Sequence, residues 1–332
     1  MIRTLNGIRA LLFIFIFSAH FKYITINSMY GSTIFKLFNI ARFAVLSFFL
    51  LSGFCIALGY SDKFNKYSEN LYCDFLIKRF IRIYPLYILT IIINWIINNV
   101  IGNPVGWFAD VIFICYIFTP IALWVFNKTK RLRHHIIFCL INYIILAVFS
   151  IYLVLIHQPN HEFYYRFYLI RIFEYLIALD IGFIYLKKLK NNLNFEAFNN
   201  YFYKSVIDFI YIIIFILIMY VLPNNLLYRH VIGIPVICSF IIFMCIEKRS
   251  ILYDIFSSKF FNFLGNISYE CYMIHILVLT TMTPYAKYYL SAISKIIIFY
   301  VMALILTIVI SIIYQKAILL IKKQYKAIIN KK

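Results

Sequence analysis

Long apolar stretches recur along the whole sequence, and they constrain its fold more than any other feature. A helix needs about 20 apolar residues to cross the hydrocarbon core of a bilayer. Inside that core only helices and closed barrels satisfy all their backbone groups, and runs of this length are typical of helices. We therefore predict an all-α, polytopic membrane protein with about ten transmembrane helices. The expected spans are residues 8–26, 40–60, 83–100, 107–126, 136–156, 167–186, 206–222, 226–246, 260–282 and 292–321.

The composition excludes a soluble globular protein. Hydrophobic residues make up 64% of the chain and charged residues 13%, with a mean hydropathy of +0.88. Soluble domains are nearer half apolar and a quarter charged. The polar gaps between the apolar stretches are too short for a separate soluble domain. We expect one transmembrane core over residues 1–321 and a basic cytoplasmic tail over 322–332.

The net charge of +20 is explained by membrane orientation. In a soluble protein such an excess would suggest a nucleic-acid partner. With the N-terminus placed in the cytoplasm, 24 of the 32 Lys and Arg residues fall in segments on the cytoplasmic side. Short cytoplasmic loops are enriched in Lys and Arg. We therefore expect an N-in, C-in topology, with membrane lipids and no nucleic acid among the partners.

The first span carries two basic side chains in register. Arg9 and His20 are eleven residues apart, which returns to nearly the same helix face after a rise of about 16 Å. Ionisable groups inside a span are expensive and are by default functional candidates. With Arg9 at the cytoplasmic rim, His20 lies near the midplane, where an imidazole can act as a general base or an acyl relay. The alternative is a histidine that only hydrogen-bonds between helices.

A basic cluster precedes the third expected span. Lys78, Arg79 and Arg82 crowd its cytoplasmic entrance, and Pro85 falls in its first turn, where proline is tolerated. Arg79 and Arg82 share one helix face. Such a pair can bind the phosphates of a cytoplasmic ligand. The alternative is that all three are positive-inside anchors.

The second and sixth spans contain further polar or small residues. Ser52 and Gly53 allow close helix approach, and packing alone accounts for them. Arg171 and Glu174 are spaced to pair within one helix. Asp180 has no obvious local partner.

The ninth span presents a polar face. Ser268, Tyr272 and His275 are spaced four and three residues apart, so they lie on one side of a helix, with Tyr269 beside them. They form a polar surface inside the bundle or hydrogen bonds between helices. In the fourth span, Asp110 is expected near the outer rim, exposed to water. The seven cysteines contain no CxxC pair, so we predict neither a disulfide framework nor a metal site.

The order of these landmarks resembles the membrane acyltransferase-3 family, the multispan O-acyltransferases that modify bacterial surface polysaccharides. The similarity covers about residues 5–320. Family members often have Asp and Gly where this chain has Asn6 and Ala10, and many have a Glu in the fourth span. The matching elements are the Arg9 to His20 pair, the FFxxSG element at 48–53, the RxxR element at 79–82 and the GxxSYxxYxxH element at 265–275.

This resemblance implies an enzyme of the bacterial cytoplasmic (inner) membrane. It would transfer an acyl group, expected to be acetyl, from cytoplasmic acyl-CoA to a hydroxyl of a surface or lipid-linked sugar. Acyl-CoA would be a co-substrate, with no bound cofactor and no metal, and the partners would be a saccharide acceptor and glycan-assembly proteins. The alternative is a transporter or flippase for a lipid-linked sugar or small solute. The implied roles are catalysis for His20 and Arg9, CoA binding for Lys78, Arg79 and Arg82, and substrate contact or support for Ser52, Gly53, Glu174, Ser268, Tyr269, Tyr272 and His275.

Overall fold

The computed structural model describes residues 2–25, 41–129, 131–156, 166–189, 200–220, 228–246, 249–289 and 292–329. Within these ranges the regular structure is entirely helical. The longer helices are α1 (Arg3–Thr25), α3 (Ala41–Tyr60), α4 (Glu69–Asn98), α5 (Trp107–Lys128), α6 (Leu132–Leu155), α8 (Tyr168–Ile184), α9 (Tyr201–Tyr220), α11 (Ile234–Ile246), α14 (Ser268–Tyr289) and α15 (Ile293–Ile329). The short ones are η2 (Lys63–Asn65), η3 (Tyr185–Leu189), η5 (Arg229–Gly233), α12 (Ile251–Ser257) and α13 (Lys259–Asn266).

All ten expected spans coincide with helices, which confirms the all-α, polytopic membrane fold. Among the described residues, eight helices are long and apolar enough to cross a membrane by themselves. The count becomes nine when α13 and α14 are taken as one broken span. The sixth expected span is α8, which has only 17 residues before it passes into the π-helical turn η3.

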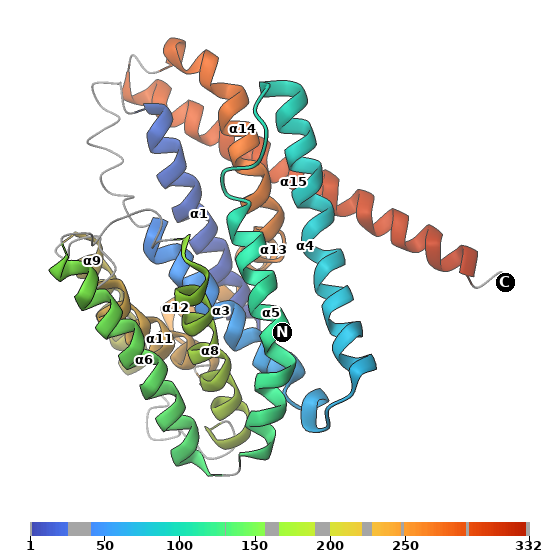
Figure 1. The fold of residues 1–332 in the computed structure, drawn as a ribbon. Helices are drawn as coiled ribbons and strands as arrows, with labels where there is room; N and C mark the ends of the chain where they lie inside the picture. Colours follow the sequence, from blue (N-terminus) through green and yellow to red (C-terminus); the bar gives the residue numbers. More distant parts are fainter. Residues whose placement is uncertain are drawn as a thin grey trace.

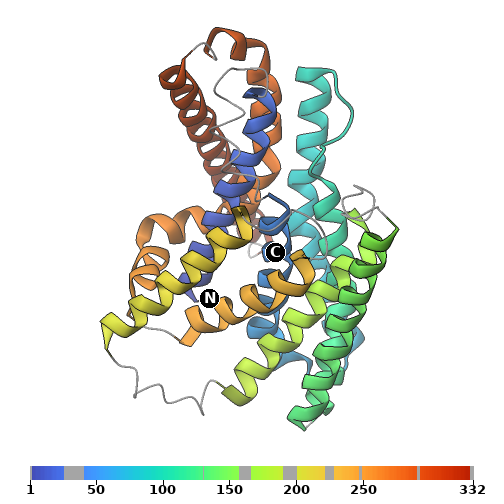
Figure 2. The same cartoon turned by 90° about the vertical axis from the view of Figure 1, so that its left-hand side faces the viewer.

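Two helices form the centre of the bundle. The apolar part of α1 is 72% buried and that of α3 is 67% buried, whereas α9 is only 17% buried. Figure 1 shows α4 on one side of this central pair and α6 and α9 on the other, with α15 crossing the bundle from the upper left to the right, and Figure 2 shows the same bundle turned by 90°. The first two spans therefore contribute most to the core.

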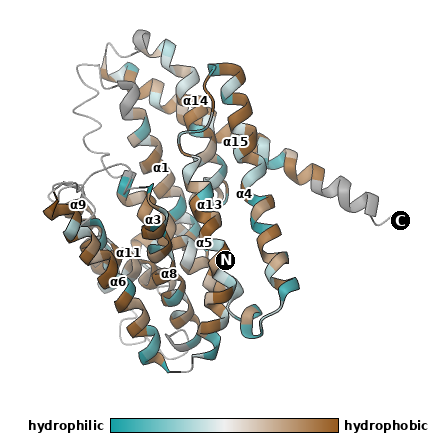
Figure 3. Ribbon diagram, in the orientation of Figure 1, coloured by the Kyte–Doolittle hydropathy of each residue, from teal (hydrophilic) through white to brown (hydrophobic). Residues whose placement is uncertain are grey.

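The outer helices present apolar side chains outward. On α4, Ile88, Ile92 and Ile96 are 50%, 46% and 70% exposed, and on α6 Val148 is 58% exposed. Figure 3 shows these hydrophobic stretches along the outside of the bundle. Such a surface is costly in water and suits a hydrocarbon environment, because it exposes apolar side chains while the helices satisfy their own backbone groups.

Glycines bring α3 and α8 into contact backbone to backbone. A Cβ atom on Gly53 would overlap the carbonyl oxygen of Tyr175, and one on Gly182 would crowd the backbone of Phe54. Small residues permit this approach between membrane helices. The packing interpretation therefore accounts for the position of Gly53.

The third expected span begins earlier than predicted. Residue 83 was expected as its start, but α4 begins at Glu69, so Lys78, Arg79 and Arg82 lie on a helix and not in a loop. Pro85 consequently sits inside the helix and not in its first turn. A search for apolar runs misses the first turns of α4 because they are charged.

The ninth expected span is broken, where one continuous helix was predicted. Helices α13 and α14 meet at Ile267 with a bend of 68°. The bend lies beside a close helix contact, in which a Cβ on Gly265 would overlap the carbonyl of Asn6 on α1. The Ser268 hydroxyl donates to the Gly265 carbonyl at 2.8 Å across the break.

The last helix continues into the expected tail. Helix α15 runs without interruption to Ile329, so residues 322–329 are helical, and residues 330–332 lie outside the described part of the chain.

Candidate active site

A cavity of about 260 Å³ opens between α1, α3, α4, α5 and α14. One end of the bundle holds the first turns of α1 and α4 and the connection between α5 and α6, and we call it the basic end (Figure 1). The cavity lies toward this end. The opposite end, called here the far end, holds the last turns of α4 and the second half of α14. Seven of the predicted site residues line the cavity, namely Arg9, Ser52, Arg79, Arg82, Ser268, Tyr269 and Tyr272.

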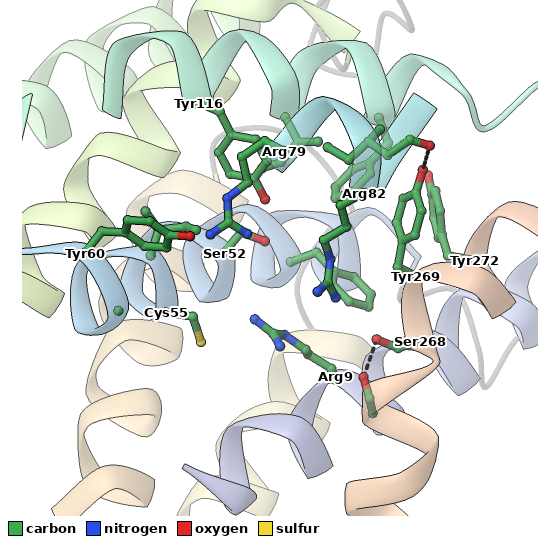
Figure 4. A pocket seen from close by; sticks show the side chains of 17 residues that line it. Arg9, Ser52, Cys55, Tyr60, Arg79, Arg82, Tyr116, Ser268, Tyr269 and Tyr272 are labelled. Carbon is green, nitrogen blue, oxygen red and sulfur yellow. Dashed lines mark hydrogen bonds between the residues drawn. The ribbon is translucent and has the colours of Figure 1, made fainter. Parts of the chain in front are cut away.

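Three guanidinium groups converge on this cavity. Figure 4 shows Arg9 from α1 and Arg79 and Arg82 from α4 pointing into the same space. None of the lining residues, all of which belong to the described part of the chain, is acidic. Like charges held together away from bulk water repel one another more strongly than they do in solution. The arrangement therefore favours an anionic ligand with more than one negative charge.

Aromatic rings fix the orientation of Arg79. Its guanidinium carbon lies 4.9 Å from the ring centre of Tyr60, 5.2 Å from that of Phe75 and 5.5 Å from that of Tyr116. Guanidinium groups are attracted to the faces of aromatic rings. The Nε atom of Arg79 is buried and has no hydrogen-bond partner among the described residues. The rings thus hold the cation in place at the cavity wall.

A cluster of neutral amides orients Arg9. Its Nη1 donates to Oδ1 of Asn6 at 3.3 Å, and Nδ2 of Asn6 donates to Oδ1 of Asn262 and of Asn266, both at 2.9 Å. Asn6 is a neutral amide, so it positions the guanidinium of Arg9 without cancelling its charge.

Two adjacent histidines lie beyond the cavity residue Tyr272. Tyr272 lines the cavity, and its ring centre lies 5.6 Å from that of His275. The ring of His275 lies 5.1 Å from that of His20. His275 follows the cavity residue Ser268 by seven positions on α14, which corresponds to a rise of about 10 Å. The structure therefore brings together the two histidines that the sequence placed on different spans.

Hydrogen bonding assigns the protonated nitrogen of His275. Its Nδ1 donates to the carbonyl of Tyr272 at 2.5 Å, so in the neutral ring Nε2 carries a lone pair. His275 is fully buried, and Nε2 has no hydrogen-bond partner among the described residues. Phe13 and Phe17 cover the ring, each with its centre 6.4 Å away. The lone pair of Nε2 can therefore accept a hydrogen bond from a group that enters the site.

Five predicted residues lie outside the cavity wall, namely the two histidines described above and Lys78, Gly53 and Glu174. Lys78 pairs with Asp74 at 2.5 Å on the exposed side of α4. Gly53 packs on α8, and Glu174 belongs to a separate polar network.

That network joins α6, α8 and η5. As predicted, Arg171 and Glu174 pair, with Nη1 donating to the two carboxylate oxygens at 2.9 and 2.7 Å. His230 and Ser150 were missed, although His230 is an ionisable residue inside an expected span. The imidazole lies 2.8 Å from Oε1 of Glu174 and 2.6 Å from Oγ of Ser150. All four side chains are fully buried, so the network ties three helices together.

Two carboxylates have partners that the sequence did not indicate. Nδ1 of His135 lies 2.6 Å from Oδ1 of Asp180. Asp110 was expected to be exposed to water near the rim, but it is half-buried, with the hydroxyls of Tyr84 and Tyr87 at 3.4 and 3.5 Å. Both hydroxyls come from α4, which sequence spacing within α5 does not reveal. Across the described residues, no group of three His, Cys, Asp or Glu side chains is arranged to hold a metal ion.

Comparison with known proteins identifies the family of the chain. A family model described as an acyltransferase domain matches residues 2–315, which include the cavity and both histidines. No curated protein and no solved structure matches the chain. The match also favours an enzyme over the transporter considered from the sequence. The chain therefore belongs to the acyltransferase-3 family, and it is a multi-pass membrane acyltransferase.

Proposed function

We propose that the protein transfers an acetyl group from cytoplasmic acetyl-CoA to a hydroxyl of a surface or lipid-linked sugar. The basic end would face the cytoplasm of a bacterial inner membrane, in keeping with the positive-inside rule. The observation that carries the proposal is the three-arginine cavity, whose wall residue Tyr272 packs on His275, which in turn packs on His20.

The cavity suits the donor because CoA is a polyanion with a long neutral arm. Arg9, Arg79 and Arg82 would bind its phosphates, for which planar guanidinium groups are well shaped. The pantetheine arm would extend past Tyr272 toward the histidines. CoA itself then stays at the basic end, and only the small acyl group reaches the middle of the bundle.

In the proposed reaction the thioester carbon exchanges sulfur for oxygen. The acceptor hydroxyl attacks the thioester carbonyl, the C–O bond forms and the C–S bond breaks. The hydroxyl proton passes to His20 and then to the thiolate of CoA, so the step needs no oxidant or other reactant. A His20 that first accepts the acyl group on nitrogen and then passes it to the hydroxyl gives the same products. His275, held by its Nδ1 hydrogen bond, would support His20 as a positioning residue.

The test uses purified protein in lipid nanodiscs, radiolabelled acetyl-CoA and a panel of octyl glycosides as acceptors. The proposal predicts release of CoA thiol together with a labelled glycoside. If octyl glycosides stay unlabelled while the folded protein is present, the proposal is wrong.

Gly59 offers a matched pair of variants for the cavity. It lies on the cavity wall, and a Cβ built on it meets no atom within 4 Å. Gly59→Ala should therefore leave the reaction unchanged. Gly59→Phe should fill the mouth of the cavity and raise the KM for acetyl-CoA by about tenfold or more. Equal KM values for the two variants would contradict the placement of the donor.

A further inference from the structure

A second cavity, of about 210 Å³, lies between α1, α3, α9, α11 and α12. It shares no lining residue with the three-arginine cavity. On α3, Leu51 lines the second cavity and the adjacent Ser52 lines the first, so the two cavities lie on faces of that helix about 100° apart. We call the second one the apolar cavity.

The wall of the apolar cavity excludes charged and polar ligands. Of the described residues that line it, only Ser47 has a polar side chain, and its hydroxyl donates to the Phe43 carbonyl of its own helix at 2.9 Å. A buried water needs two to four polar partners, which this wall does not offer. Cavities of about 150 Å³ lined by Leu, Ile and Phe stay free of water and bind benzene. A hydrocarbon is therefore the class of ligand that fits.

The apolar cavity reaches the outer surface of the bundle beside α9. The ring of Phe215 on α9 meets those of Phe43 and Phe240, with ring centres 5.9 and 5.2 Å apart. These rings join α9 to the core. Ile216, the next lining residue on α9, is 47% exposed. Figure 2 shows α9, in yellow, on the outside of the bundle, so the cavity opens toward the lipid.

The apolar cavity also lies at the middle depth of the spans. Helix α1, residues 3–25, contributes lining residues between 8 and 15, and α9, residues 201–220, contributes residues between 212 and 216. At this depth the bilayer consists of hydrocarbon chains. An empty cavity destabilises a protein in proportion to its volume. Entry of a chain from the surrounding lipid is therefore favourable.

We infer that the apolar cavity binds one acyl chain of a membrane phospholipid. The chain enters beside Ile216 and fills the space between α9 and the central pair α1 and α3. It thereby stabilises the attachment of α9 to the bundle. Phospholipid is the source because its chains form the bulk medium at this depth. The site does not depend on the proposed reaction, because none of its lining residues belongs to the donor cavity.

The test places the protein in phosphatidylethanolamine nanodiscs that contain a small fraction of phosphatidylethanolamine with a diazirine midway along one acyl chain. Illumination attaches this chain to the side chains it touches, and peptide mass spectrometry locates the label. We expect label on Leu12 and Leu51, which line the cavity and are 6% and 0% exposed. Label confined to outward side chains such as Ile213, which is 54% exposed, would overturn the inference.

Two serines provide matched variants. Ser47 lines the cavity, whereas Ser239 is exposed on α11 and donates only to the Val236 carbonyl of its own helix, at 2.9 Å. Ser47→Phe should fill the cavity and lower the labelling of Leu12 and Leu51 by about fivefold or more, and Ser239→Phe should match wild type.

Equal labelling of Leu12 and Leu51 in the two variants would overturn the site. Loss of the label from wild-type protein when a polyprenyl phosphate is added at a small mole fraction would overturn the phospholipid assignment, since the cavity would then prefer that chain. Should Ser47→Phe fail to fold, the map of labelled residues in the wild-type protein still decides between a bound chain and ordinary contact with bulk lipid.

Discussion

Replacing Arg79 by alanine should weaken acetyl-CoA binding without stopping the chemistry. Arg79 is half-buried in the cavity wall between the rings of Tyr60, Phe75 and Tyr116, and its buried Nε has no partner among the described residues. Arg79 lines the cavity and neither histidine does, so we expect it to bind the CoA part of the donor and to contribute equally to the ground state and the transition state. The expected change is a higher KM with a nearly constant kcat.

The magnitude follows from the interactions that are lost. Hydrogen bonds to charged groups contribute about 1.5–3 kcal/mol. Because about 1.4 kcal/mol corresponds to a factor of ten, Arg79→Ala should raise the acetyl-CoA KM about 10- to 150-fold. Arg79→Lys keeps the charge but loses the planar fork and the ring stacking, so its KM should rise about three- to tenfold.

Lys78 is the matched control on the same helix. Its side chain is 60% exposed and pairs with Asp74 outside the cavity. Exposed ion pairs contribute little, so Lys78→Ala should change the acetyl-CoA KM by less than about twofold. Steady-state release of CoA thiol from nanodisc-embedded protein measures all three variants. A similar KM for Arg79→Ala and Lys78→Ala would refute the phosphate-binding role and leave both residues as topology anchors.

Three further predictions concern packing, access and the buried network. Gly53→Ala should lower the free energy of unfolding by about 1–3 kcal/mol, because the added Cβ would overlap the backbone of α8. The measurement is the melting temperature, and a value equal to that of Gly59→Ala would contradict this packing. Methyl methanethiosulfonate should modify Cys55 more slowly when acetyl-CoA fills the cavity, whereas exposed Cys73 should react at the same rate with and without acetyl-CoA. Peptide mass spectrometry measures both rates, and no protection of Cys55 would contradict the donor site. His230→Ala should destabilise the protein by about 1–3 kcal/mol, because it leaves the buried Ser150 and Glu174 without this partner. It should not alter the acetyl-CoA KM. A large KM effect would place the network in the donor site.

Features within one helix could be predicted from the sequence. Arg79 and Arg82 share a face because helical geometry fixes side chains one turn apart, and both line the cavity. The same geometry relates Ser268, Tyr272 and His275 along α14. Local spacing is sufficient in these cases because neighbours along a helix do not depend on how the helix packs.

Features between helices could not be predicted from spacing. His135 and Asp180 are 45 residues apart, and His230 and Glu174 are 56 apart, so their pairing depends on which faces of the helices meet. The bend at Ile267 lies next to the contact of Gly265 with Asn6, which is about 260 residues away along the chain. A hydropathy pattern records the length of an apolar run, but it does not record which helix lies against it.

Two asparagines illustrate the same limit. Asn98 donates to the Thr280 hydroxyl and Asn103 to the Met273 carbonyl, so both join the region of α4 to α14. These partners are 182 and 170 residues away along the chain, and the order of residues gives no indication of either contact.

The central claim is that acyl transfer takes place at His20. The most direct measurement is a single-turnover assay in nanodiscs, in which labelled acetyl-CoA and an octyl glycoside are mixed with wild-type protein or with His20→Gln. The account predicts that His20→Gln lowers the rate of glycoside labelling by about 100-fold or more, while acetyl-CoA still protects Cys55 from modification. Labelling at the wild-type rate by the His20→Gln protein would contradict the account.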